Sequence, residues 1–154
     1  MNAKNKSTEC TVNDPNVSFG FVLQDLARLM RRNFNRRIQA EELGLTQAQW
    51  QALAHISKRE GLSQAALADI LEAQPITIAR LIDRMEAAGW VERRPDPNDR
   101  RAVCLYMMPK AQPILEKMWA LAAETRVEAT QGISEKEKEL LLDILLRMRQ
   151  NFCG

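Results

Sequence analysis

Apolar side chains recur three or four positions apart along most of the chain, which is the spacing of amphipathic helices. Between residues 17 and 41 the repeating positions are Phe19, Val22, Leu23, Leu26, Met30, Phe34 and Ile38. Further stripes of this kind predict helices over residues 46–60, 63–71, 75–89 and 110–130, and a last one from residue 134 onward. The pattern therefore predicts a mostly helical protein.

Polar and turn-forming residues mark the starts of these helices. Thr46 and Ser134 each stand three residues before a glutamine or glutamate, which is the spacing of a capping box, and Ser63 can cap the third helix. Pro75 opens the fourth helix, where the missing N–H of proline costs no hydrogen bond. The expected core positions are Trp50, Leu53, Ile56, Ala66, Leu67, Ile70, Ile78, Leu81, Ile82, Met85, Ile114, Leu115, Met118, Leu121, Ala122, Leu141, Ile144, Leu145, Met148 and Phe152.

After Gly89 the period of the pattern changes. The runs WVERR and RAVCLYM are typical of β-strands, and the intervening PDPND consists of turn formers. We expect a stiff β-hairpin after three short helices, which makes the fold mainly α with a small β-hairpin: a winged helix-turn-helix with N- and C-terminal dimerisation helices. The flanking helices carry more apolar surface than one small core needs, so they are assigned to dimerisation. The expected division is a flexible tail (1–16), an N-terminal dimerisation helix (17–45), a DNA-binding lobe (46–108) and C-terminal dimerisation helices (109–154).

Composition adds the class of protein. The length of 154 residues and the 45% hydrophobic content are those of one globular domain. The sequence has no apolar run of about 18 residues and no signal peptide, so a cytoplasmic protein without membrane contact is expected. The net charge of +2 does not by itself favour nucleic acid, but RLMRRNFNRR and the hairpin are locally rich in arginine. The arginines of the first helix are interpreted as a solvated face.

The helix that begins at residue 75 has an unusual outer face. Exposed isoleucine and threonine beside arginine suit base edges, because apolar groups contact the thymine methyl and arginine bonds guanine. The base contacts are therefore predicted for Gln74, Ile76, Thr77 and Arg80. Arg84 lies further along the helix and is predicted to meet phosphate. The alternative is that Arg80 and Arg84 only pair with Asp83 or Glu86.

The hairpin beside this helix would act as a wing. An arginine at its tip can enter the minor groove, where narrow A/T stretches concentrate negative potential. The further residues expected at DNA are Arg100 and Arg101 at the tip, Arg94 or Arg93 on the first strand, and Ser63 and Gln64 at a helix N-terminus that can bind phosphate. Asp99 is expected to bond an arginine or the turn backbone and so fix the tip. The alternative is an ordinary surface hairpin with solvated arginines.

Other functions find less support in the residue pattern. Cys10, Cys104 and Cys153 are widely spaced and His55 is the only histidine, so neither a disulfide framework nor a metal site is expected. The sequence has no glycine-rich phosphate loop and no Gly-x-Ser-x-Gly elbow, so neither an enzyme nor a cofactor is expected. A winged-helix module that binds another protein instead of DNA is the alternative.

The segment LADILEAQPITIARLIDRMEAAGWVERRPDPNDRRAVCLYMMPKA resembles the MarR family of transcriptional regulators, and the SlyA-like branch in particular. Its most specific element is the D-x-x-D-R-R wing, formed here by Asp96, Asp99, Arg100 and Arg101. The similarity covers roughly residues 18–152. It implies a homodimeric repressor on a palindromic operator in double-stranded DNA. Residues 74–84 would lie in the major groove and Arg100 in the minor groove, with Arg101 bracing the wing.

The resemblance also implies an effector. Family members often respond to small aromatic acids, such as salicylate and other phenolic compounds, which bind between the dimerisation helices and the DNA-binding lobe. The residues that would line this site are Met30, Phe34, Trp50 and His55, with Arg31 as a carboxylate partner. The alternative for the apolar ones is a plain core position. Peroxide-sensing relatives carry a cysteine near the start of the first long helix, which residues 17–41 lack, and redox sensing stays an alternative.

Overall fold

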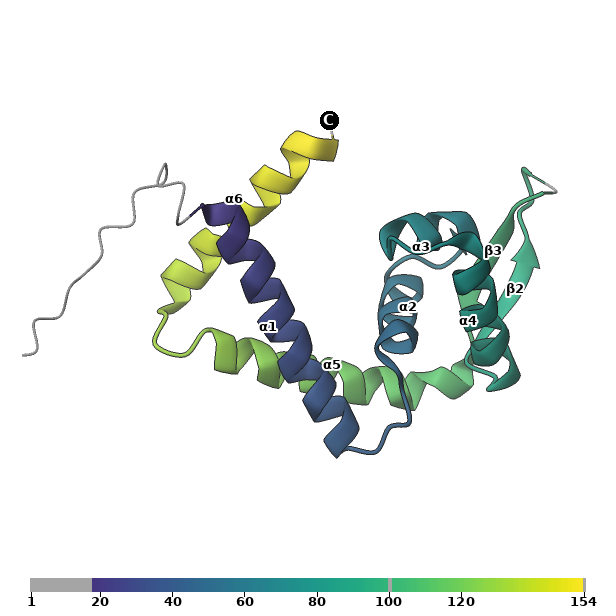
Figure 1. Ribbon diagram of the computed structural model, residues 1–154, viewed down its shortest axis with the longest axis horizontal. Helices are drawn as coiled ribbons and strands as arrows, with labels where there is room; N and C mark the ends of the chain where they lie inside the picture. The colour runs from purple at the N-terminus through teal and green to yellow at the C-terminus, as the bar shows by residue number, and fades with distance from the viewer. Residues whose placement is uncertain (1–17, 100, 154) are drawn as a thin grey trace, which may run out of the picture.

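The computed structural model describes residues 18–99 and 101–153. The tail expected at residues 1–16, with Cys10, and the wing residue Arg100 lie outside the described residues. Most of the described chain is helical and a small sheet completes it, which confirms the expected fold class (Figure 1). The elements are α1 (Phe19–Ala40), α2 (Gln47–Lys58), β1 (Leu62–Ser63), α3 (Gln64–Ile70), α4 (Pro75–Ala87), β2 (Val91–Pro95), β3 (Val103–Met107), the 3₁₀ helix η1 (Pro109–Ala111), α5 (Gln112–Ala129) and α6 (Glu135–Cys153).

The predicted helix starts are confirmed by their hydrogen bonds. The Thr46 backbone N–H donates to Gln49 Oε1 at 2.8 Å, and the Gln49 N–H returns a bond to Thr46 Oγ1, so α2 begins with a complete capping box. Ser63 Oγ accepts from the backbone N–H of Ala66 at the start of α3. Ser134 exchanges the corresponding bonds with Glu137 before α6.

The predicted hairpin is also confirmed, and it is part of a larger sheet. Strands β2 and β3 pair antiparallel from Val91 opposite Met107 to Pro95 opposite Val103. The other edge of β3 pairs with β1, where Leu62 lies opposite Leu105, so the strand order is β1-β3-β2. The sequence pattern does not predict β1, because two residues are too few to show an alternation. Strands and α2–α4 together make the winged helix-turn-helix lobe.

The core of this lobe is made by the predicted apolar stripes. The inward side chains of α4, which are Ile78, Leu81, Ile82 and Met85, are at most 2% exposed, and Leu53, Ile56 and Leu67 are fully buried. The expected burial of Ile70 is wrong, because its side chain is 44% exposed. Helix α3 ends at this residue after two turns, and Ala68 takes the inward place instead.

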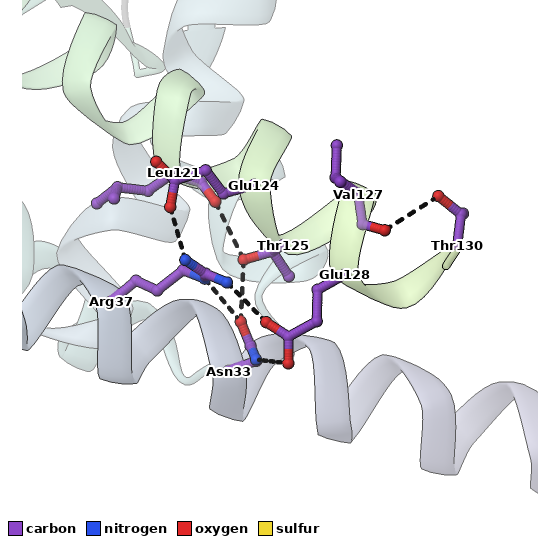
Figure 2. A network of polar contacts seen from close by, with 8 residues as sticks. All are labelled: Asn33, Arg37, Leu121, Glu124, Thr125, Val127, Glu128 and Thr130. Carbon is purple, nitrogen blue, oxygen red and sulfur yellow. Dashed lines mark hydrogen bonds and ion pairs between the residues drawn. The ribbon is translucent and has the colours of Figure 1, made fainter. Parts of the chain in front are cut away.

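A polar network fixes α1 across α5 (Figure 2). Arg37 donates to Glu124 Oε2 and to Glu128 Oε2, both at 2.6 Å, and its Nε donates to Asn33 Oδ1. Asn33 Nδ2 also donates to Glu128, and Thr125 Oγ1 donates to Asn33. The hydrogen bonds to Asn33 and Arg37 hold the pKa of Glu128 below its usual range, so the carboxylate stays charged. This network sets how the first long helix lies against the fifth.

Helix α6 has no covering layer from residues 18–99 and 101–153. The expected burial of Leu141, Ile144, Leu145, Met148 and Phe152 is wrong for the single chain, because no residue of α6 is buried. The N-terminal half of α1 is similar, since Phe19, Val22 and Leu26 are each more than 40% exposed. Figure 1 shows α5 running from the winged lobe to the region of α1 and α6. Within the described part of the chain, no helix has the length and apolarity needed to cross a membrane.

Candidate nucleic-acid interface and neighbouring cleft

Helix α4 presents the predicted residues on its outer face. Because its apolar stripe faces the core, Ile76, Thr77, Arg80 and Arg84 all lie exposed, and the Ile76 side chain is 61% exposed. Gln74 is the N-cap residue, yet its side chain makes no cap hydrogen bond. The outer face of α4 therefore carries an apolar side chain, a hydroxyl and an amide without a cap bond near its start, with Arg80 and Arg84 further along. This is the set of groups that reads base edges and phosphates.

The two arginines of this face are not neutralised within the helix. The nearby acids Asp83 and Glu86 are paired with Arg93, each at 2.8 Å from its Nη1. Among the described residues, neither Arg80 nor Arg84 takes part in an ion pair. The alternative that these arginines serve only to pair with Asp83 or Glu86 is therefore wrong, and both guanidinium groups stand free at the surface.

Arg93 ties the wing to the two helices of the helix-turn-helix. In addition to its acidic partners, its Nε donates to Gln64 Oε1 at 3.0 Å and its Nη2 donates to the carbonyl oxygen of Ala79 at 3.0 Å. The Arg93 side chain is only 24% exposed. Its role is to position β2, α3 and α4 relative to one another. Gln64, expected at phosphate, uses its oxygen on Arg93 and keeps its amide N–H groups uncommitted.

Of the two arginines on the first wing strand, Arg94 is the exposed one. Its guanidinium lies over the ring of Tyr106, 4.2 Å from the ring centroid, and pairs with Glu92. Ser63 is half-buried, and its hydroxyl is occupied by the cap bond to α3. The structure therefore brings Arg94 to the surface of the lobe. The Ser63 hydroxyl is already bonded, so only the backbone at the start of α3 remains for a contact with DNA.

Two aspartates shape the wing tip. Asp96 Oδ1 accepts hydrogen bonds from the backbone N–H groups of Asn98, at 2.7 Å, and Asp99. Asp99 Oδ1 accepts from the backbone N–H of Arg101, at 2.9 Å, which confirms that Asp99 bonds the turn backbone. The bond from Asn98 is the main reason that the pKa of Asp96 lies below its usual range. Arg101 is exposed beside this braced turn.

Cys104 belongs to the core side of the wing. It is 5% exposed, and its thiol lies 3.5 Å from Asp96 Oδ2. Burial, and then the neighbouring carboxylate, raise the pKa of the Cys104 thiol. The thiol is therefore protonated at neutral pH, which disfavours nucleophilic or redox chemistry at this position.

An open cleft of about 740 Å³ lies between α1, α2, α3 and α5. This one cleft is lined by all five residues that the family resemblance indicates, namely Met30, Arg31, Phe34, Trp50 and His55. Its wall also contains residues that the sequence did not indicate, among them Ile70, Glu72, Trp119 and Arg126. These come from α3, the turn after it and α5, which lie far from α1 in sequence, so no local pattern could reveal them.

The cleft combines aromatic surface with cations. Phe34 and Trp50 meet edge to face with their ring centroids 4.7 Å apart, and Phe34 is also a buried core residue. Arg31 and Arg126 are exposed on the cleft wall. Burial, and secondarily the charge of Lys58, lower the pKa of His55, so this imidazole is neutral at neutral pH. In the described residues, no cluster of three histidine, cysteine, aspartate or glutamate side chains could hold a metal ion.

The fold and this interface match known proteins. The MarR family model matches residues 45–103, which span the helix-turn-helix and most of the wing. Among solved structures, the transcriptional regulator PA3341 is 33% identical, with 87% of this chain and 97% of that chain covered and a TM-score of 0.73. MarR from E. coli, in its apo form, is 25% identical over 86% of this chain and 96% of its own, with a TM-score of 0.73.

The transcriptional regulator SlyA gives a similar result. It is 26% identical, with 88% of this chain and 94% of that chain covered and a TM-score of 0.72. Its identity is nearly the same as that of MarR, so the likeness extends over the family as a whole. The matches cover the flanking helices as well as the lobe. With its winged lobe, its long flanking helices and a relative one third identical over nearly the whole length, the chain belongs to the MarR family of transcriptional regulators.

Proposed function

We propose that the protein is a homodimeric, sequence-specific DNA-binding regulator that represses transcription from a palindromic operator and is released by a small aromatic or phenolic ligand. The observation that carries the DNA-binding part is the outer face of α4, where the exposed Ile76 adjoins the unpaired Arg80 at the start of a helix. An isoleucine exposed to this extent contributes little to the core of the lobe. Next to a cation at a recognition helix, it fits the thymine methyl of a base pair.

The contacts with DNA are assigned by their place on the lobe. Gln74, Ile76, Thr77 and Arg80 read bases, because they surround the first turns of α4, the part of a recognition helix that enters the major groove. Arg84, Arg94 and the helix start at Ser63 and Gln64 meet phosphates. Arg101 braces the wing, and Arg100, which lies outside the described residues, is assigned to the minor groove from the sequence alone.

The dimer is supported by helices α1, α5 and α6. Leu140, Leu142, Leu146 and Phe152 of α6 are all exposed, together with the N-terminal half of α1. Apolar surface of this extent is costly in water and marks an interface. A second copy that lays its own α1 and α6 on these faces would bury them and give a symmetric pair of winged lobes.

The effector mechanism follows from the position of the cleft. Its walls belong both to the proposed dimerisation helices, α1 and α5, and to the lobe, α2 and α3. A bound aromatic acid, with its carboxylate on Arg31 and its ring against Phe34 and Trp50, would change how the lobe stands on α5. It shifts the equilibrium only as far as it binds one arrangement more tightly than the other. Half-sites one turn apart, about 34 Å, then no longer fit both recognition helices.

Selection from a pool of random duplexes with the purified chain tests the proposal. We expect enriched sequences to contain two inverted half-sites whose centres are about one helical turn, or a multiple of it, apart. Adding salicylate during the selection should lower the recovery of these duplexes. A pool without any enriched inverted repeat would contradict the proposed function.

A further inference from the structure

A second hollow of about 510 Å³ runs along the outer side of α1 and reaches the start of α2. Four arginines line it, Arg28, Arg31, Arg32 and Arg36, together with the amide residues Gln39 and Gln47. No acidic residue is part of its wall. We call this hollow the arginine groove. In Figure 1 the lower half of α1 lies at the bottom of the view and the wing tip at the upper right, so the groove lies away from the wing.

The charges of the groove are poorly balanced by the protein itself. Arg28 pairs with Asp25, but among the described residues Arg31, Arg32 and Arg36 form no ion pair. Arg28, Arg32 and Arg36 follow one another four positions apart on the same helix, and like charges at this spacing repel each other and destabilise the helix. A multiply charged anion in the groove would remove this repulsion. A purely solvated face would gain nothing from clustering its cations around a hollow.

The groove joins the aromatic cleft. Arg31 and Gln47 line both hollows. The wall between them is braced, because Trp50 Nε1 donates to Asn35 Oδ1 at 2.7 Å and Asn35 Nδ2 donates to Gln47 Oε1 at 2.7 Å. Gln47 uses only its side-chain oxygen in this contact, so its amide N–H groups can donate hydrogen bonds to a ligand. An aromatic cleft and a cationic groove thus meet at one fixed edge.

We propose that the cleft and the arginine groove together form one site for an amphiphilic anion, with a flat apolar group in the cleft and a phosphate-bearing chain on the arginines. The inference rests on the proposed function, in which the cleft takes the effector, and it specifies the effector class. Guanidinium groups bind phosphate oxygens in pairs of parallel hydrogen bonds, so three unpaired arginines suit two or more phosphates. Each hollow has the volume of a small-molecule site.

A nucleic-acid strand is the less favoured occupant of the same surface. Single-stranded binding needs aromatic faces on which successive bases stack. Here Phe34 and Trp50 meet edge to face, and Trp50 is held by Asn35, so the aromatic surface is one fixed cleft and not a row of platforms. The groove also spans only about three turns of α1, from Arg28 to Gln39.

The groove is tested first with inorganic tripolyphosphate, titrated calorimetrically into the full-length protein at low salt. The double variant Arg32→Gln/Arg36→Gln should bind at least about tenfold more weakly, because each lost charge-assisted hydrogen bond counts strongly in the affinity. The matched control Arg59→Gln/Lys136→Gln removes the same charge from residues that line neither hollow and should stay within about twofold. No binding by the wild type, or an equal loss in both double variants, would overturn the proposal.

The joined site is tested with benzoate, coenzyme A, benzoyl-coenzyme A and ATP, read by the fluorescence of Trp50 and Trp119 in the cleft wall. We expect benzoyl-coenzyme A to bind more tightly than benzoate or coenzyme A alone, and to lose this advantage in Arg32→Gln/Arg36→Gln while benzoate binding is retained. Equal or tighter binding of ATP would identify a nucleoside polyphosphate as the source of the same chemistry. Two results would overturn the small-molecule site. One is that benzoyl-coenzyme A binds no more tightly than benzoate. The other is that a thymidine decamer displaces tripolyphosphate at a lower concentration than benzoyl-coenzyme A does.

Duplex binding by the same preparations separates this inference from the function on which it rests. The double groove variant should bind operator duplex as the wild type does when no small molecule is added. If the wild type binds duplex but the probes ignore the groove, only the present inference fails. If the wild type binds no duplex, the proposed function fails irrespective of the probes.

Discussion

At the scale of single residues, the recognition surface depends on which arginine forms ion pairs with the acidic side chains of α4. Arg93 binds Asp83 and Glu86, and this leaves Arg80 and Arg84 exposed without partners. From sequence, Arg93 and Arg94 looked equally suited to DNA, since their charge and side-chain length are the same. The distinction between a positioning arginine and a reading arginine arises only when β2 is placed beside α4, which is a long-range contact that no local pattern encodes.

Replacing Arg80 by alanine should both weaken operator binding and relax its sequence preference. A good bidentate contact to a base discriminates by about 1–3 kcal/mol, so the operator should lose affinity by that amount while unrelated duplexes lose less. Arg84→Ala is the matched variant one turn on, and it should weaken all duplexes alike. Fluorescence anisotropy at one fixed salt concentration measures both. A uniform loss in Arg80→Ala would move this residue to the phosphate contacts.

Arg93→Ala should act through stability. Its removal leaves Asp83, Glu86 and Gln64 without their partner and is expected to cost about 1–3 kcal/mol of unfolding free energy, the usual worth of hydrogen bonds to a charged group. Denaturant unfolding followed by circular dichroism measures the loss. The exposed neighbour Arg94 provides the control, since loss of its contacts with Tyr106 and Glu92 in Arg94→Ala should cost no more than about 1 kcal/mol. An unchanged midpoint in Arg93→Ala would contradict the positioning role.

At the scale of elements, the wing loop should respond to acid. The bond from the Asn98 N–H stabilises the charged form of Asp96 and lowers its pKa. A lowered pKa in the folded state means that the contribution of this carboxylate is fully present at neutral pH and is lost as the pH falls through the folded-state pKa. The amide protons of Asn98 and Asp99 should then exchange faster and shift in NMR spectra. In Asp96→Ala these amides should already be unprotected at neutral pH, and constant protection down to strongly acidic pH in the wild type would disprove the prediction.

Helix boundaries were predictable because their signals are local. Thr46, Ser63 and Pro75 act within one turn of their own positions, and the structure confirms each of them. Ile70 shows the limit, since its helical phase indicated burial but the space in front of it is an open cleft built by other elements. The same holds for β1, which forms only because β3 offers it an edge.

At the scale of the whole molecule, the apolar stripe that the sequence predicts on α6 is left uncovered by the described part of the single chain. Periodicity shows that a helix has an apolar side, but the partner of that side can belong to another chain. In the proposed homodimer, Leu142→Glu on α6 should leave the winged lobe folded, because this side chain is 59% exposed and contributes nothing to the protomer core. It should shift the mass measured by light scattering from two chains to one and weaken operator binding. A variant that remains a dimer would exclude this part of α6 from the interface.

The most direct test of the central claim, that paired winged lobes of this chain bind duplex DNA, is a titration of the selected operator duplex over a series of salt concentrations. We expect saturation at two chains per duplex and a binding constant that falls steeply with salt, by roughly 0.9 logarithmic units per tenfold salt for each phosphate contacted. A duplex that remains unbound at low salt, or that binds with no dependence on salt, would contradict the account and favour a winged-helix protein that recognises another protein.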